Sequence, residues 1–276
     1  ILRMAYLIQQ DYRRLIQDTL LSQLVGGNFD TLESFELAAI EDIKSYLVQK
    51  YDTAAEFTDT DQWVYGTVYY AKDRVFIDAA AYAIASTYQI NDLALYLGSI
   101  YRCIAANTTG AWNASKWTLV GAQYALFYAL NPKTDWDYYT EYDAGTQVYY
   151  KKKTYTSVRA NSGNQPDENP ADWGTGTPFS IAGTVQIWDT NYWTAGDNRN
   201  QKMVQTVIDA VLYNLHSRIA PTNVPENRLI RFDNAIAWLK QCARGTDITS
   251  GLTRIQPRTG KRIRYGSSLP KQNNNF

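Results

Sequence analysis

The fold of the middle of this chain is decided by the stretch from Tyr142 to Val158, which reads YDAGTQVYYKKKTYTSV. Val148 and Tyr150 alternate with polar neighbours, and the alternation resumes at Tyr155 after a lysine-rich break. Apolar residues at every second position are typical of a half-buried strand, and a short polar break between two such runs is typical of a tight turn. The stretch therefore predicts a small β-hairpin.

The same pattern occurs earlier in the chain at one fixed spacing. Three tyrosines, an alanine and an asparagine recur 54 residues later without a gap, and Trp117 is matched by Trp173 at a spacing of 56 residues. The matched residues are Tyr88, Tyr96, Tyr101, Ala106 and Asn107 in the first copy and Tyr142, Tyr150, Tyr155, Ala160 and Asn161 in the second. Such matching indicates a duplicated module. We expect two hairpin modules, at about residues 88–121 and 142–175. Because so small a hairpin buries little core, each tryptophan is expected to close over the tyrosines.

The second copy resembles the small chitin-binding type of carbohydrate-binding module. The matching residues are Gly145, Val148, Tyr150, Tyr155, Gly163, Pro166, Pro170 and Trp173. The first copy has Asn91 and Ala94 where the pattern has glycine and valine, and the resemblance covers roughly 35 residues of each copy. In that family exposed aromatic rings stack on sugars. We expect the repeated tyrosines and tryptophans themselves to be structural, which is the usual role of buried aromatic residues.

Four aromatic residues outside the repeat are the candidates for contact with a glycan or with another protein. They are Trp112, Trp188, Tyr192 and Trp193, of which the last three belong to the run WDTNYW. A sugar platform is one interpretation of this run. We favour a protein interface, because aromatic residues are enriched at assembly contacts.

The N-terminal part of the chain carries the period of amphipathic helices. Apolar residues recur every three or four positions from residue 32 to residue 51, and Asp30 with Glu33 forms a candidate capping pair. A shorter helix is expected from Tyr6 to Leu24, stopped by the glycine pair at 26 and 27.

Near the other end, two further helices are predicted to form an antiparallel hairpin. The buried stripe of the first is Val204, Val207, Ile208, Val211, Leu212, Leu215 and Ile219, and that of the second is Leu229, Phe232, Ile236, Leu239 and Ala243. Asp197 or Asn198 is the expected cap of the first helix. Pro225 lies near the start of the second helix and Gly245 just past its end.

The helical ends together resemble the small neck protein family of Mu-like tailed phages, thought to be head–tail connectors. The C-terminal resemblance lies between Asp209 and Gly245, in the runs LHSRI, VPENR and RFDNAIAWLKQCARG. The N-terminal resemblance is AAIEDIKSYL, from Ala38, followed by KYD from Lys50. The two pieces cover about 100 residues and are interrupted by the duplicated β region, which is a departure from that shorter family. The resemblance implies a structural protein that acts by assembly.

Catalytic chemistry has little support in the sequence. The single histidine, His216, lies beside the apolar stripe of its helix, where a hydrogen-bonding packing role is the usual one. No serine or cysteine is spaced from it as in a nucleophilic triad, and no phosphate-binding Gly-x-x-x-x-Gly-Lys loop occurs. Cys103 and Cys242 are too few for a disulfide framework or a metal cluster. We expect no enzyme activity, cofactor or metal. We also expect no membrane contact, since no apolar stretch approaches the length of a membrane span.

The end of the chain is basic. After Asp247 every charged residue is cationic, although the whole chain has a net charge of +0. The cations are Arg254, Arg258, Lys261, Arg262, Arg264 and Lys271. Because no core periodicity accompanies them, we expect residues 251–276 to form an extended arm. The arm either reaches a neighbouring subunit or the portal, or packs across its own domain. Its cations also allow weak, salt-sensitive contact with DNA.

These patterns together predict an α+β protein. Residues 1–60 and 196–250 are expected to form a helical connector-like domain, and residues 61–195 a β-rich insertion that holds the two modules. We expect a subunit of a homo-oligomeric ring in the neck of a tailed phage virion, assembled in the host bacterial cytoplasm and in contact with the portal and other neck or tail proteins. The alternative is a secreted or virion-surface module that binds chitin-type glycans.

Overall fold

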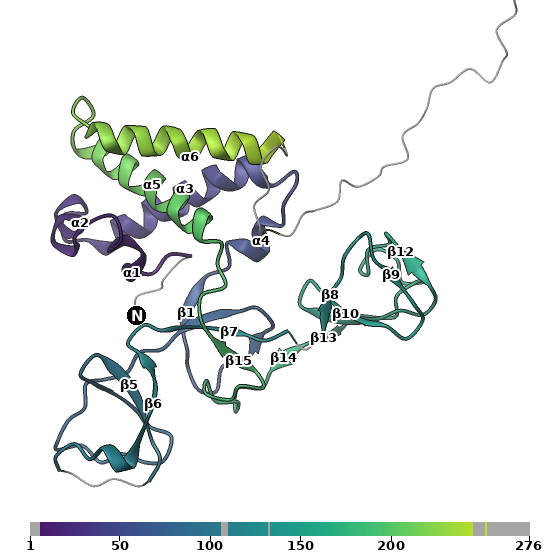
Figure 1. The fold of residues 1–276 in the computed structure, drawn as a ribbon, viewed down its shortest axis with the longest axis horizontal. Coiled ribbons are helices and arrows are strands. Elements are labelled where there is room, and N and C mark those ends of the chain that lie inside the picture. The colour runs from purple at the N-terminus through teal and green to yellow at the C-terminus, as the bar shows by residue number, and fades with distance from the viewer. Residues whose placement is uncertain (1–5, 106–109, 132, 245–251, 253–276) are drawn as a thin grey trace, which may run out of the picture.

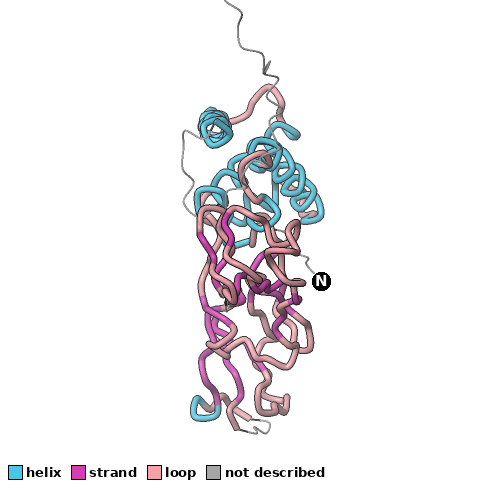
Figure 2. Tube along the Cα trace, turned by 90° about the vertical axis from the view of Figure 1, so that its right-hand side faces the viewer, coloured by secondary structure: helices cyan, strands magenta, loops and turns pink. Residues whose placement is uncertain are grey.

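The computed structural model describes residues 6–105, 110–131, 133–244 and 252. Helices from both ends of the chain gather at one end of the molecule, and the strands extend away from them (Figure 1 and Figure 2). The α+β class expected from the sequence is confirmed. Among the described residues, no helix is long and apolar enough to cross a membrane.

The helices share one hydrophobic core. They are α1 (Gln9–Tyr12), α2 (Asp18–Leu24), α3 (Phe29–Leu47), α4 (Thr53–Glu56), α5 (Gln201–Ile219) and α6 (Glu226–Arg244), and a short 3-10 helix covers Ala114–Lys116. Ile43 of α3, Leu212 of α5 and Leu239 of α6 are at most 1% exposed and belong to the same cluster. The core therefore joins segments that lie more than 150 residues apart in the sequence.

Three helix boundaries differ from the sequence-based expectation. The cap of α3 is Asn28, whose side chain accepts a hydrogen bond from the Asp30 N–H at 2.9 Å. The cap of α5 is Asn200, which accepts from the Met203 N–H at 3.0 Å, because Asp197 is engaged by Arg199. The helix expected from Tyr6 to Leu24 is interrupted by a turn between α1 and α2. The stop at Gly26 and Gly27 is confirmed, and both adopt a left-handed backbone with φ values of 65° and 73°.

The buried face of α6 is rotated relative to the expected one. Ala235, Leu239 and Cys242 are its buried residues, whereas Leu229 is 43% exposed. The apolar pattern fits two neighbouring faces of this helix, and packing against α3 and α5 selects one of them. Ile219 at the end of α5 is likewise 55% exposed, while the rest of the predicted α5 stripe is buried.

The β region consists of short strands in small sheets. They are β1 (Thr60–Gln62), β2 (Tyr69–Tyr70), β3 (Arg74–Phe76), β4 (Leu93–Tyr96), β5 (Ser99–Cys103), β6 (Trp117–Ala122), β7 (Leu126–Ala129), β8 (Thr134–Asp135), β9 (Glu141–Tyr142), β10 (Gln147–Tyr150), β11 (Lys153–Thr156), β12 (Asn161–Ser162), β13 (Thr177–Pro178), β14 (Ser180–Ile181) and β15 (Trp193–Ala195). The sheet orders are β1-β3-β7-β15, β4-β5-β6, β13-β11-β10-β8, β12-β9 and β14-β2.

Both predicted hairpins are present. Strands β10 and β11 pair antiparallel around Lys151 and Lys152, whose φ values are 46° and 62°. Strands β4 and β5 pair in the same way around Leu97 and Gly98, with φ values of 48° and 79°. Two successive left-handed residues are the mark of the two-residue turn that matches the twist of a β-hairpin.

The hairpin arrangement occurs a third time, which the sequence analysis did not anticipate. In each copy a tryptophan ring lies edge-on to a tyrosine ring, and the tyrosine hydroxyl accepts a hydrogen bond from the backbone N–H five residues earlier. The ring pairs are Trp117–Tyr88 at 5.1 Å, Trp173–Tyr142 at 5.2 Å and Trp193–Tyr69 at 5.2 Å. The N–H donors are Ala83, Asp137 and Val64, at 2.8, 2.6 and 2.8 Å from their respective hydroxyl oxygens.

Backbone hydrogen bonds repeat in the same way. A left-handed residue before the first strand donates its N–H to the carbonyl at the end of the second strand in all three copies. The pairs are Asn91 to Cys103, Gly145 to Ser157 and Lys72 to Ala129, at 2.8, 2.7 and 2.9 Å. The arrangement is therefore one fold used three times.

We call the third copy the central module (residues 60–77, 124–131 and 179–196), and the other two the first outer module (residues 79–122) and the second outer module (residues 133–178). The first outer module replaces the turn of the central hairpin, because Tyr124 donates its N–H to the Ile77 carbonyl at 2.9 Å. The second outer module lies in the sequence between β7 and β15. The outer modules project to different sides of the central one (Figure 1).

Candidate assembly surfaces

The repeated tyrosines and tryptophans form the cores of the outer modules, as expected. Tyr142, Tyr155 and Trp173 are at most 5% exposed, and the Trp173 indole N–H donates to the Asn164 carbonyl at 2.8 Å. Trp117 is 5% exposed. The remaining members of the repeat, Tyr88, Tyr96, Tyr101 and Tyr150, are half-buried.

Trp112 belongs to the core of the first outer module. Its ring stacks on Tyr96 at 4.0 Å and on Trp117 at 5.0 Å, and it meets Tyr101 edge-on at 5.0 Å. The indole is only half-buried, but its stacking partners are supplied by its own module. Trp112 is therefore a packing residue rather than a free platform for a sugar ring.

Trp188 connects two modules. It is half-buried in the central module, and the Arg102 guanidinium of β5 lies 4.6 Å from its ring centroid. Such a cation–π contact uses one face of the ring within the chain. Trp188 thus links the central module to Arg102 of the first outer module.

Trp193 does not lie outside the repeated framework, and that expectation was wrong. It is 2% exposed and occupies the closing position of the central module, which leaves no ring surface for an external contact. Its neighbour Tyr192 is 39% exposed and remains a candidate for contact with another molecule.

The surfaces of the outer modules differ sharply in charge. The first outer module holds only Asp92, Arg102 and Lys116 as charged residues, whereas its exposed aliphatic side chains are Ile84, Ile90, Leu97, Ile104 and Leu119. The second outer module contains Lys133, Asp135, Asp137, Glu141, Asp143, Lys151, Lys152, Lys153, Arg159, Asp167, Glu168 and Asp172. Some of these pair with each other, as Lys151 and Asp167 do at 2.6 Å.

The helices are joined to the central module by buried charges. The Arg199 guanidinium, which precedes α5, donates to Asp11 at 2.7 Å, to Asp197 at 2.8 Å and to the Tyr6 carbonyl at 2.8 Å. Burial by itself raises the pKa of Asp197, but the hydrogen bonds and the positive charge of Arg199 outweigh that effect and hold the pKa below its ordinary value. The ionised pair therefore persists at neutral pH.

A second arginine completes this junction from the β side. Arg74 of β3 donates to Asn198 at 2.7 Å and to the backbone carbonyl of Glu56 at 2.6 Å. The Glu56 carboxylate accepts from the Tyr6 hydroxyl at 2.6 Å. Because these side chains come from the N-terminal segment, α4, β3 and the linker to α5, they hold the helices and the central module in one orientation. No periodic pattern in the sequence marks them.

A buried carboxyl lies inside the helical core. Glu36 of α3 is 6% exposed and accepts a hydrogen bond from the Tyr12 hydroxyl at 2.6 Å. Burial raises the pKa of Glu36 to about 8, an effect that the hydrogen bond from Tyr12 only partly offsets. The pair connects α1 to α3.

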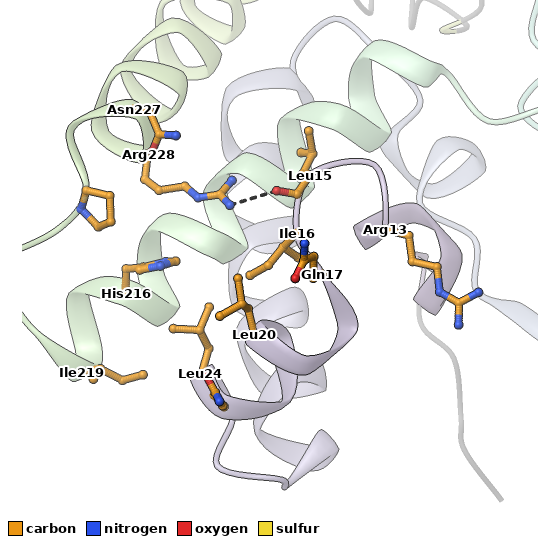
Figure 3. Close-up of a pocket in the computed structure, with 12 residues that line it drawn as sticks. Arg13, Leu15, Ile16, Gln17, Leu20, Leu24, His216, Ile219, Asn227 and Arg228 are labelled. Carbon is orange, nitrogen blue, oxygen red and sulfur yellow. Dashed lines mark hydrogen bonds between the residues drawn. The ribbon is translucent and has the colours of Figure 1, made fainter.

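A groove opens beside His216, between α2 and the turn that joins α5 to α6 (Figure 3). Its volume is about 670 Å³, and its lining includes Leu15, Leu20, Leu24 and Ile219. His216 Nδ1 lies 2.7 Å from the Leu212 carbonyl of its own helix, which agrees with the packing role expected for this histidine.

Several sequence-based expectations fall outside the described residues. They concern Ala106, Asn107, Gly245 and the assembly arm with Arg254, Arg258, Lys261, Arg262, Arg264 and Lys271. Leu252, which precedes the basic part of the arm, is 9% exposed and packs with the helical core. Within the described ranges, no group of three or more histidine, cysteine or acidic side chains is placed to hold a metal ion.

Comparison of the chain with protein-family models and with curated protein sequences finds no match.

Proposed function

We propose that this protein is a structural subunit of an oligomeric ring in the neck of a tailed phage virion, between the head portal and the tail. The observation that carries the proposal is the common core of α3, α5 and α6, in which Ile43, Leu212 and Leu239 meet. These are the helices whose sequences resemble the connector family, and their packing into one bundle fits that resemblance.

In this proposal the β modules are insertions in a helical bundle built from both ends of the chain. The junction around Arg199 and Arg74 holds them at a fixed angle to the bundle. A rigid angle suits a ring subunit, since the modules of all subunits then project alike. The first outer module, with few charges and exposed aliphatic residues, is suited to contact neighbouring virion proteins. The basic arm would reach the portal or an adjacent subunit.

A role in glycan binding has weaker support. Trp112 and Trp188 are engaged by Tyr96 and Arg102 within the chain, and Trp193 is buried. Stacking on a sugar requires an open aromatic face, and Tyr192, at 39%, is the most exposed of the four expected residues. We therefore place assembly before sugar recognition.

The test is the location and stoichiometry of the chain in virions. Cryo-electron microscopy of purified particles should show a closed ring at the neck into which the helical bundle and the three β modules fit. Particles assembled without the protein should separate into filled heads and free tails. A chain that is absent from virions and remains monomeric, but saturably binds chito-oligosaccharides, would support the glycan-binding alternative instead.

A further inference from the structure

The outer face of α3 is exposed although it carries aliphatic side chains. Leu37 is 50% exposed and Val48, just past the end of α3, is 53% exposed. The two residues are eleven positions apart, which places them on the same side of the helix. Charged side chains accompany them on this side. Asp30, Glu33 and Glu41 lie at spacings of seven, four and four residues from Leu37, whereas Lys44, seven residues after Leu37, is basic and pairs with Glu41 at 2.7 Å. This α3 face is therefore apolar and carries a net negative charge.

The groove beside His216 has the complementary character. Leu20 and Ile219 are 49% and 55% exposed at its edge, and the apolar Leu15, Ile16 and Leu24 lie deeper (Figure 3). Its lining includes Arg13 and Arg228 but no acidic residue. Arg13 pairs with Asp18 at 2.9 Å, whereas Arg228 donates to the Leu15 carbonyl at 3.0 Å. The groove is thus an apolar depression whose edge carries two arginines, one of them already paired with Asp18.

Two occupants from within the same chain are disfavoured. The basic arm carries cations only, so the arginines of the groove repel it. The chain's own α3 is held in the bundle by Ile40 and Ile43, which are 4% and 1% exposed. Its outer face therefore cannot turn into the groove of its own chain. The exposed face of α3 in a second copy of the chain offers both the aliphatic side chains and the negative charge that suit the groove.

We propose that the outer face of α3 in one subunit docks into the groove of the next subunit. This inference rests on the proposed ring function and names the two surfaces that build the ring. The groove and the α3 face are different patches of one chain, so the contact is head-to-tail. Head-to-tail contacts produce a closed ring when the rotation between subunits closes.

The experiment uses two variants of the full chain that each break one side of the contact. Leu20→Asp places an acid at the groove, and Leu37→Asp removes the aliphatic centre of the α3 face. Both residues are about half exposed, so each variant should fold, which circular dichroism and thermal unfolding would verify. Leu97→Asp, at an 88% exposed position of the first outer module, is the matched control.

Native mass spectrometry and sedimentation then give the oligomeric states. The wild type and the control should form the ring, and each groove or α3 variant alone should be monomeric, with self-association weakened at least about tenfold. An equimolar mixture of the two variants should stop at heterodimers, because one intact groove and one intact α3 face remain. A symmetric interface, in which the same patch of both subunits meets, would not give heterodimers in this mixture.

The outcomes separate the interface from the proposed function. If both variants still form rings, the ring function stands and this interface is rejected. Variants that are monomeric but do not form heterodimers when mixed would also reject the pairing of these two surfaces. A folded wild-type chain that stays monomeric, and is missing from the neck of virions, contradicts the inference and the proposed function together.

Discussion

The two outer modules share one arrangement of strands and aromatic residues, but they hold the loop before the final tryptophan by different interactions. Ala94 and Val148 occupy equivalent positions at the centre of each hairpin and are both 0% exposed. In the first outer module the loop before Trp117 is held by the stacked ring of Trp112. The second outer module holds its loop by hydrogen bonds, since the Asn164 amide donates to Asp172 at 2.7 Å.

This difference shows how few positions define such a small fold. A tyrosine, a small or branched residue at the hairpin centre and a closing tryptophan recur, while the loop and the surface vary freely. Because the framework does not depend on surface charge, one copy can become nearly uncharged and the other highly charged without loss of the fold. The first outer module is thereby suited to a contact and the second to solvent.

The largest expected effect separates the central module from the outer ones. Trp193→Ala should cost about 3–5 kcal/mol of unfolding free energy and increase hydrogen exchange in all three modules, because the outer modules are inserted in the loops of the central one. Trp173→Ala should have a similar local cost but affect only the second outer module. Hydrogen exchange with mass spectrometry distinguishes the two patterns. Equal, localised exchange in both variants would contradict the nested arrangement.

The next prediction compares the two ways of holding the loop. Trp112→Ala should destabilise the first outer module by about 2 kcal/mol, less than loss of a fully buried tryptophan, since the ring is half-buried. Asn164→Ala in the second outer module removes one hydrogen bond to Asp172 and should cost about 1 kcal/mol. Urea unfolding monitored by tryptophan fluorescence measures both. A larger loss for Asn164→Ala than for Trp112→Ala would reverse our account of the two loops.

The helical core offers a third comparison, because it contains the buried carboxyl of Glu36. Burial raises its pKa from an ordinary value of 4.5 to about 8. Between these values the folded chain binds the proton and the unfolded chain releases it, so stability should fall as pH rises, by up to about 1.4 kcal/mol per pH unit. Glu36→Gln preserves an acceptor for Tyr12 and should remove this contribution. Thermal unfolding from pH 5 to pH 8 tests it, and parallel pH profiles for the two proteins would refute it.

The smallest expected effect concerns the surfaces of the outer modules. The double change Leu97→Ser and Leu119→Ser should alter the free energy of unfolding by no more than about 0.5 kcal/mol, because both side chains are largely exposed, at 88% and 58%. It should nevertheless lower retention on a hydrophobic-interaction column. Lys151→Ala in the second outer module is the control and should not lower retention. A large loss of stability in the double variant would show that these leucines support the fold.

Local patterns in the sequence were sufficient for the three long helices α3, α5 and α6 and for two of the three modules, but not for the break between α1 and α2. The period of α3 and α5 predicts most of their buried faces, and the lysine-rich break predicts the turn at Lys151 and Lys152. These features depend on residues only a few positions away, so they can be recognised in the sequence. The packing role of His216 was foreseen for the same reason.

Tertiary structure decided the features that depend on distant residues. The cap of α5 is Asn200 rather than Asp197, which is bonded to Arg199, and the cap of α3 is Asn28 rather than Asp30. The buried face of α6 is set by contact with α3 and α5. The junction of Arg199 with Asp11 joins residues at opposite ends of the sequence, where no spacing rule applies.

The central module is the clearest case. Its first half matches the first outer module at a spacing of 19 residues, from Tyr69 to Tyr88 and from Asp73 to Asp92. Phe127 and Trp193 complete the central module, but in the sequence they lie after the inserted outer modules. A comparison without gaps therefore does not find them. The sequence by itself therefore determined what each module is made of. Only folding brought Trp193 to Tyr69, because burial of aromatic surface acts between rings that meet in space, whatever length of chain lies between them.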